Sequence, residues 1–401
     1  MEARMQAATG PVPAPDKPAW NAVFSLALGV FGLVTAEFLP ASLLTPMAAS
    51  LDVSEGLAGQ AVTVTAVIAL MAGLLIPTMT RGIDRRYVLL AFSALLMVSN
   101  LLVAFAPNLQ ILLGARVLLG VAIGGFWTMS AATAMRLVPA DLVPRALSMI
   151  FAGVSAATIA AAPLGSYFGD LIGWRNVFLL ATVLGLLAFA WQWLALPRMA
   201  PAGATRLGTM VEVLRRPGVA VGMFACLLVF AGHFAFFTYL RPFLENVTGV
   251  GVVGVSGILL GFGVANFLGT SLAGFLLERN LRATLMLMPL LMGTIGLILA
   301  GLGGAPLADA GLVALWGMAF GAVPVAWSTW LTRVVPDEAE SGGGLIVAAV
   351  QFAIAAGAAA GGVVFDASGA RGVFLGSGLV LLTATLCVFA VFRARTLPVA
   401  Q

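Results

Sequence analysis

The sequence has little charge and few of the side chains that bind nucleotides. Charged residues make up 9% of the 401 residues, whereas a soluble domain carries roughly 25%. The excess of 20 Lys and Arg over 16 Asp and Glu is small, and we expect no nucleic-acid partner. Lys17 is the single lysine, and the sequence has no GxxxxGK motif. Because a P-loop binds the phosphates of ATP through the lysine of this motif, ATP binding by a P-loop is excluded.

Histidine and cysteine are as scarce as lysine. His233 is the only histidine, and the two cysteines, Cys226 and Cys387, lie inside apolar runs. These residues offer no convincing metal site, and the two thiols do not indicate a disulfide framework. No loop is long enough for an extramembrane sensor domain. We therefore expect neither an enzyme nor a signalling protein, and no metal or cofactor.

Apolar residues and glycine are abundant instead. Hydrophobic residues make up 61% of the chain, the mean hydropathy is +1.08, and 47 residues are glycine. A helix needs about 20 apolar residues to cross a membrane. Twelve runs meet this requirement, so the sequence predicts an all-α membrane protein with twelve transmembrane helices. The runs lie at 21–48, 56–79, 87–106, 109–135, 146–169, 175–196, 218–244, 251–277, 283–303, 310–332, 343–365 and 373–392.

The positions of the basic residues predict the orientation. Residues 1–19 are polar and rich in proline and lack the apolar core of a signal peptide, so we expect a disordered cytoplasmic tail. With the N-terminus in the cytoplasm, sixteen of the twenty Lys and Arg residues lie on the cytoplasmic side and three lie outside. Cytoplasmic loops carry such an excess. Both termini are therefore predicted to be cytoplasmic, including a short tail at 396–401.

Short similarities between the two halves of the sequence indicate an internal repeat. GWRNVF at 173–178 resembles GARGVF at 369–374, and RLVP at 136–139 resembles RVVP at 333–336, at offsets of 196 and 197. An offset of six helices preserves the direction of each span, which predicts two parallel six-helix repeats related by an axis along the membrane normal. The predicted parts are a first half at 20–196, a cytoplasmic linker at 197–217 with a short surface helix near 208–216, and a second half at 218–395.

Several motifs resemble the drug:proton antiporter branch of the major facilitator superfamily, which includes the sugar and arabinose efflux permeases. They are DRR at 84–86, RVLLGVAIGGFW at 116–127 and PLGSYFGDLIGWRNVF at 163–178. Other segments resemble, more narrowly, the bacterial purine ribonucleoside efflux pumps. These are WNAVFS at 20–25, EFLPASLLTPMA at 37–48, SEGLAGQAVTVTA at 54–66, APLGS at 162–166, FAFFTYLRP at 234–242 and VPVAWSTW at 323–330.

The resemblance implies a proton-coupled secondary transporter of the bacterial inner membrane. It implies that a monomer exports a small solute by alternating access, with purine ribonucleosides such as inosine and guanosine as the expected substrates. The expected partners are this substrate, protons and the lipid bilayer. The alternatives are a sugar or multidrug efflux antiporter of the same superfamily, or an uncoupled facilitator. An uncoupled facilitator has no need for a titratable group buried in the membrane.

Glu37 and Arg116 are the only charged residues that the sequence places well inside a predicted span. Charges at this depth are costly and indicate function. The two residues lie at similar depths, and the resemblance implies that their helices adjoin. Glu37 is therefore predicted to carry the coupled proton beside Arg116. A pair that only locks two helices together is the alternative. Pro40 and Pro46 are expected to interrupt the helix just beyond Glu37.

His233 lies near the middle of the seventh predicted span, where it can relay protons or remain a neutral residue of the cavity. Aromatic faces suit the stacking of flat heterocycles, although each aromatic residue can equally belong to the core. The amides Asn266 and Gln351 can read a purine edge or bond a neighbouring helix. The predicted substrate-binding residues are Phe126, Trp127, Phe237, Asn266, Trp327 and Gln351.

Two further groups of residues have structural as well as functional interpretations. Arg81, Asp84, Arg85 and Arg86 form a tight turn between the second and third spans. They are predicted to form an inner gate, or else only the positively charged cytoplasmic flank. Pairs of glycines four residues apart predict close helix packing. These pairs are Gly120–Gly124, Gly165–Gly169, Gly257–Gly261 and Gly357–Gly361.

Overall fold

The computed structural model describes residues 17–200 and 207–394, and these residues form helices and no strands. Ten of the described helices are long and apolar enough to cross a membrane. Two of the ten contain a residue with non-helical backbone angles, at Asn280 and at Gly369, and each of these two covers two predicted spans. All twelve predicted spans therefore fall in helices, and the predicted fold class is confirmed. The tails at 1–16 and 396–401 lie outside the described residues.

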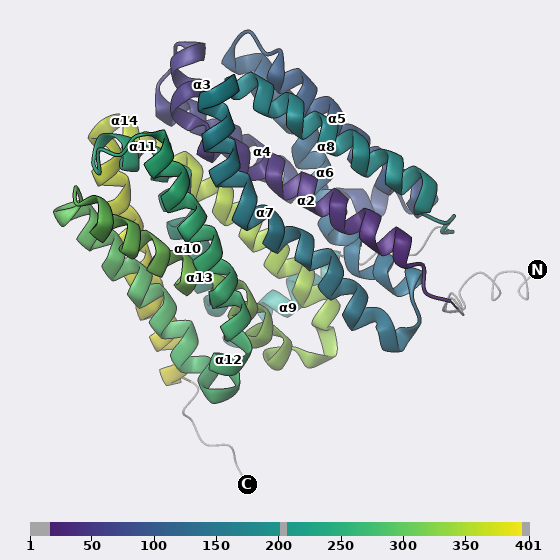
Figure 1. Cartoon of the computed structure of the whole chain (residues 1–401). Helices are drawn as coiled ribbons and strands as arrows, with labels where there is room; N and C mark the ends of the chain where they lie inside the picture. The colour runs from purple at the N-terminus through teal and green to yellow at the C-terminus, as the bar shows by residue number, and fades with distance from the viewer. Residues whose placement is uncertain (1–16, 201–206, 395–401) are drawn as a thin grey trace, which may run out of the picture.

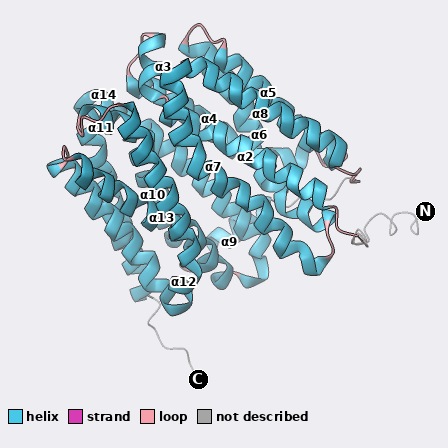
Figure 2. Cartoon of the chain, in the orientation of Figure 1, coloured by secondary structure: helices cyan, strands magenta, loops and turns pink. Residues whose placement is uncertain are grey.

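The helices form two bundles. Along the chain, the short helix α9 (Leu207–Arg215) separates the helices of the first bundle from those of the second. Figures 1 and 2 show the two bundles side by side, with α7 next to the second bundle. At their junction α7 packs on α12 and α4 packs on α14. The first bundle consists of α2 (Trp20–Ser42), α3 (Leu44–Leu51), α4 (Glu55–Met79), α5 (Arg85–Ala104), α6 (Leu109–Leu137), α7 (Val143–Ile172) and α8 (Trp174–Ala195). The second consists of α10 (Val219–Thr238), α11 (Leu240–Asn246), α12 (Val252–Leu302), α13 (Pro306–Val334) and α14 (Ala339–Ala394).

Local irregularities recur at the predicted repeat distance. The first span is broken at Leu43 and the seventh at Tyr239, which are 196 residues apart. Gly173 and Gly369 both have positive φ angles and are also 196 residues apart. The short 3₁₀ turns at Ala140–Leu142 and Pro336–Glu338 have the same separation. A break or turn in a helix depends on how the neighbouring helices pack around it. Its recurrence at the repeat distance therefore shows that the two bundles have the same architecture.

Glycines allow helices within each bundle to approach closely. A Cβ atom on Gly120 would lie 2.6 Å from the backbone oxygen of Thr65 on α4, so α6 requires a glycine there. Three of the four predicted pairs lie against a neighbouring helix. The prediction for Gly257–Gly261 is wrong, because no other residue comes within 4 Å of a Cβ atom at either position. Spacing alone does not tell which face of a helix meets a neighbour.

The predicted surface helix of the linker is present as α9 and is tied to the second bundle. Arg216, directly after α9, donates two hydrogen bonds to the Asp337 carboxylate, at 2.7 and 2.6 Å. The guanidinium lowers the pKa of Asp337 below its ordinary value, and the carboxylate raises the pKa of Arg216. The domain boundaries at 196 and 218 and the cytoplasmic placement of both termini stay predictions.

Candidate functional site

Two prolines shape the end of the first span. Pro40 lies inside α2, and Pro46 lies in the first turn of α3. The helix breaks between them, at Leu43, rather than at either proline. A proline has no N–H to donate to the carbonyl four residues earlier. The backbone oxygens of Ala36 and Ser42 therefore lose their usual helical donors and need other partners.

Arg116 on α6 supplies the partner for the Ala36 oxygen. Its Nη1 donates to this oxygen at 2.8 Å, and its Nε donates to the hydroxyl of Thr65 on α4 at 2.9 Å. The side chain is 0% exposed. Arg116 thus joins α6 to α2 and α4 through backbone and hydroxyl oxygens. In the sequence the proline and the arginine looked unrelated, because 76 positions separate them.

Glu37 follows Ala36 on the same helix, but its carboxylate makes no ion pair with Arg116 within 4 Å. Its Oε1 atom is buried and has no hydrogen-bond partner, and the same is true of Arg116 Nη2. The carboxylate lies in the electrostatic field of Arg116 and within hydrogen-bonding reach of Gln351, on α14 of the second bundle. Glu37 therefore faces the junction of the two bundles with an oxygen available for a proton or a ligand.

His233 occupies the position in the second bundle that Glu37 occupies in the first, because the two residues are 196 apart. The repeat offset contained this signal, but comparing only similar residues missed it. The indole N–H of Trp316 on α13 donates to His233 Nδ1 at 3.1 Å. An indole nitrogen is only a donor, so Nδ1 must be the acceptor and the imidazole is neutral. The ring also stacks on Phe320, with centroids 3.3 Å apart.

Aromatic rings connect the surroundings of Glu37 and His233. Phe38, the neighbour of Glu37, meets Phe237 of the second bundle edge to face at 5.3 Å. Phe237 in turn stacks on His233 with a centroid distance of 5.9 Å. The predicted residues Glu37, Arg116, His233, Phe237 and Gln351 are thus linked by neighbouring contacts around the junction of the bundles.

The other predicted binding residues make contacts inside their own bundles. The Asn266 amide donates to the Gly317 oxygen at 3.2 Å and joins α12 to α13. Trp127 stacks on Phe151 and meets Phe126 edge to face. Trp327 packs edge to face on Trp330. These contacts give each residue a structural role, and substrate contact by any of them stays a prediction.

Comparisons with known proteins agree on one family. The family model described as the Major Facilitator Superfamily matches residues 26–358. The purine ribonucleoside efflux pump NepI of Escherichia coli K12 is 47% identical over 379 residues, which are 94% of this chain and 96% of that protein. NepI of Shigella dysenteriae serotype 1 matches equally well. The chain belongs to the Major Facilitator Superfamily.

Two solved transporter structures share the fold. A bacterial homologue of the human lysosomal transporter Spinster has a TM-score of 0.77 at 16% identity, over 94% of this chain and 98% of that one. A D-xylose–proton symporter has a TM-score of 0.74 at 17% identity, over 92% and 96%. Together with the apolar spans, membership of the superfamily makes the chain a multi-pass membrane transporter for a small molecule.

The predicted gate residues of this transporter lie in the turn before α5 and in the first turn of that helix. Asp84 caps α5 by accepting from the backbone N–H of Arg86, and it also accepts from that of Met199. The Arg85 side chain donates to the Thr80 hydroxyl, and Arg86 donates to the Trp193 oxygen. Arg81 is exposed. These bonds fasten the turn within the first bundle and to the chain after α8, and a gating role stays a prediction.

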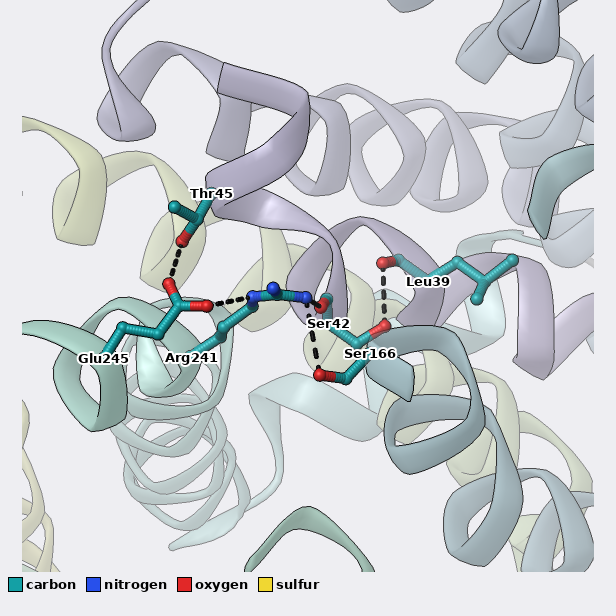
Figure 3. A network of polar contacts seen from close by, with 6 residues as sticks. All are labelled: Leu39, Ser42, Thr45, Ser166, Arg241 and Glu245. Atoms are coloured by element: carbon teal, nitrogen blue, oxygen red, sulfur yellow. Dashed lines mark hydrogen bonds and ion pairs between the residues drawn. The ribbon is translucent and has the colours of Figure 1, made fainter. Parts of the chain in front are cut away.

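Sequence reasoning missed the burial of another arginine, Arg241, which was counted only as a basic residue outside the membrane. It is 4% exposed. Figure 3 shows its side chain reaching from α11 to Ser42 at the end of α2 and to Ser166 on α7. Its neighbour in the same network, Glu245, bonds Thr45 on α3. Pro46 was the available signal, because it leaves the Ser42 oxygen without a helical donor, and a guanidinium can supply one.

Proposed function

We propose that this protein exports purine ribonucleosides across the bacterial cytoplasmic membrane in exchange for protons. It works as a monomer, by alternating access, with both termini in the cytoplasm. The substrate class is supported by relatives that are 47% identical over nearly their whole length and are named purine ribonucleoside efflux pumps. Proton coupling has its own support in this chain, and the proposal rests on that observation.

The observation is the carboxylate of Glu37 at the junction of the bundles. One of its oxygens is buried without a partner, and burial and the neighbouring groups favour opposite protonation states. Burial favours the neutral acid, whereas the charge of Arg116 and a hydrogen bond from Gln351 favour the anion. Gln351 belongs to the second bundle. Movement of one bundle against the other therefore changes the proton affinity of Glu37, which is what coupling requires.

His233, at the equivalent position, has a different task. Its Nδ1 accepts from Trp316, so the ring stays neutral and keeps its single proton on Nε2. A fixed neutral donor suits recognition of a base nitrogen or carbonyl better than proton carriage. Phe237 and the amide of Gln351 add an aromatic ring and a polar group at the same junction. We assign His233 to nucleoside recognition and Glu37 to the proton.

Transport in proteoliposomes tests both halves of the proposal. Radiolabelled inosine and guanosine, arabinose and a cationic drug are compared, each with and without an imposed pH gradient. We expect the gradient to drive the nucleosides. The variant Glu37→Gln should still exchange nucleoside down its concentration gradient but should not respond to the pH gradient. Glu212→Gln, on the exposed side of α9, is the matched control and should behave as the unmodified protein.

The possible results separate the alternatives. Gradient-driven transport by Glu37→Gln would remove Glu37 from the coupling mechanism. Transport of arabinose or the drug instead of nucleosides would disprove the substrate class and leave the transporter assignment intact. Nucleoside movement that ignores the pH gradient in the unmodified protein would indicate a facilitator.

A further inference from the structure

Arg241 connects the two bundles at the broken end of α2. It belongs to α11 of the second bundle, and its Nη1 donates to the backbone oxygen of Ser42 in the first bundle. This oxygen is the one that Pro46 leaves without a helical donor, since proline has no N–H. The same Nη1 lies 3.4 Å from the Ser166 hydroxyl on α7. A single buried guanidinium thus binds two helices of the opposite bundle.

Glu245 holds the guanidinium in this position and makes a contact of its own with the first bundle. Arg241 Nε donates to Glu245 Oε1 at 2.7 Å, one helical turn away on α11. The hydroxyl of Thr45 on α3 donates to Glu245 Oε2 at 2.6 Å. Figure 3 shows the continuous row of contacts from Thr45 through Glu245 and Arg241 to Ser42. Hydrogen bonds that involve charged groups are stronger than neutral ones, so this row is a firm junction.

A second carboxylate closes the same end of the junction. Asp366 on α14 accepts from the Ser54 hydroxyl at 2.9 Å and from the backbone N–H of Gly56 at 3.2 Å, at the start of α4. A helix N-terminus favours a negative charge. A Cβ atom on Gly56 would lie 2.5 Å from this carboxylate, so a larger residue there would displace the Asp366 side chain. The two contacts lie at the same end because α3 and the start of α4 are joined by a short turn.

We propose that Arg241 is a positioning residue that latches the broken end of α2 to the second bundle and must release it during each transport cycle. Glu37 lies five residues before Ser42 on the same helix. The latch therefore sets where Glu37 sits relative to Gln351, and its release opens this end of the junction. The inference rests on the proposed alternating-access transport, but it concerns residues outside the proton and substrate site.

Distance measurements on the full-length transporter test the latch directly. Spin labels are attached at Leu57 on α4 and Val363 on α14, both exposed, after Cys226 and Cys387 are replaced by alanine. Double electron–electron resonance then measures the distance between the two labels, and so the separation of the bundles at this end. Arg241→Gln should increase the ratio of open to closed populations about tenfold, since it removes charged hydrogen bonds across the junction. Arg241→Lys keeps the charge and should restore part of the closed population.

Arg371→Gln is the matched control. Arg371 also uses its guanidinium to bind backbone oxygens, those of Ala300 and Gly303, but both belong to its own bundle. It should leave the distance distribution unchanged. Thr45→Val, which removes one bond across the junction and keeps Arg241, should shift the populations in the same direction by a smaller factor. This milder variant also serves if Arg241→Gln does not fold.

Transport kinetics provide the second measurement. Losing the latch should change the maximal rate of nucleoside efflux more than KM, because Arg241 does not touch the proposed substrate site. Distance distributions that are the same for Arg241→Gln, Thr45→Val and the unmodified protein would overturn the latch. The proposed function fails separately, if the unmodified protein moves no nucleoside while its labels still report two populations.

Discussion

Removing the guanidinium of Arg116 should cost less stability when Pro40 is removed as well. In the structure Arg116 donates to the Ala36 oxygen because Pro40 cannot. Arg116→Met leaves this buried oxygen without a donor. Pro40→Ala restores an N–H four residues after Ala36, which can then form the ordinary helical bond. The two substitutions should therefore be coupled, although 76 positions separate the residues in the sequence.

The size of the coupling follows from the bonds involved. A hydrogen bond from a charged group contributes about 1.5 to 3 kcal/mol, and removing Arg116 breaks more than one such bond. An unsatisfied buried carbonyl accounts for about 1 to 3 kcal/mol of such a loss. Pro40→Ala returns only this share. We therefore expect a coupling free energy of about 1 to 3 kcal/mol between the two positions, in the direction of rescue.

Reversible unfolding by SDS in mixed micelles, followed by circular dichroism, gives the four free energies of unfolding for the cycle. Pro163→Ala with Arg116→Met is the control pair, because Pro163 lies inside α7 and frees a different oxygen. The control pair should be additive within about 0.5 kcal/mol. If Pro40→Ala and Arg116→Met are also additive within that limit, the explanation of Arg116 as the partner of the freed carbonyl is wrong.

Three further predictions concern packing, recognition and pH. Gly321→Val should destabilise the protein by about 1 to 3 kcal/mol, because α13 meets the α12 backbone at this glycine. Gly261→Val, where no neighbour is close, should be tolerated. The same SDS unfolding assay measures both. His233→Gln should raise KM for inosine about tenfold without changing the response to the pH gradient, as measured in proteoliposomes. Asp337→Asn should leave the pH profile of transport between pH 5 and 8 unchanged. Arg216 holds the pKa of Asp337 below its ordinary value of 3.8, so the pair is lost only as the pH falls below that range.

Much of the candidate site could be predicted from the sequence, because charge inside an apolar run is rare. Glu37 and Arg116 were identified on that basis, and the structure places them on adjoining helices. The direct ion pair that was the alternative is absent, since Arg116 bonds the Ala36 backbone oxygen and the Thr65 hydroxyl instead. This contact could not be predicted, because Arg116 and Pro40 are far apart in the sequence. Nothing along the chain indicates that a guanidinium will prefer a carbonyl freed by a proline to a carboxylate one residue away.

The junction between the bundles was less accessible to sequence reasoning. Arg241 and Asp366 lie close to the ends of predicted spans, where charged residues are ordinary. Only the fold brings Arg241 to Ser42 and Asp366 to Ser54. The equivalence of Glu37 and His233 was contained in the offset of 196, but their chemical difference hid it.

The sequence by itself determined that the protein lies in a lipid bilayer, how many spans it has, and that its two halves repeat. These properties depend on composition, on the length of apolar runs and on the spacing of turns, all of which are local or periodic. The tertiary structure decided which buried polar groups satisfy one another. That choice depends on distances between residues far apart in the chain. It is made by the need of each freed carbonyl and each buried charge for a partner where water is scarce.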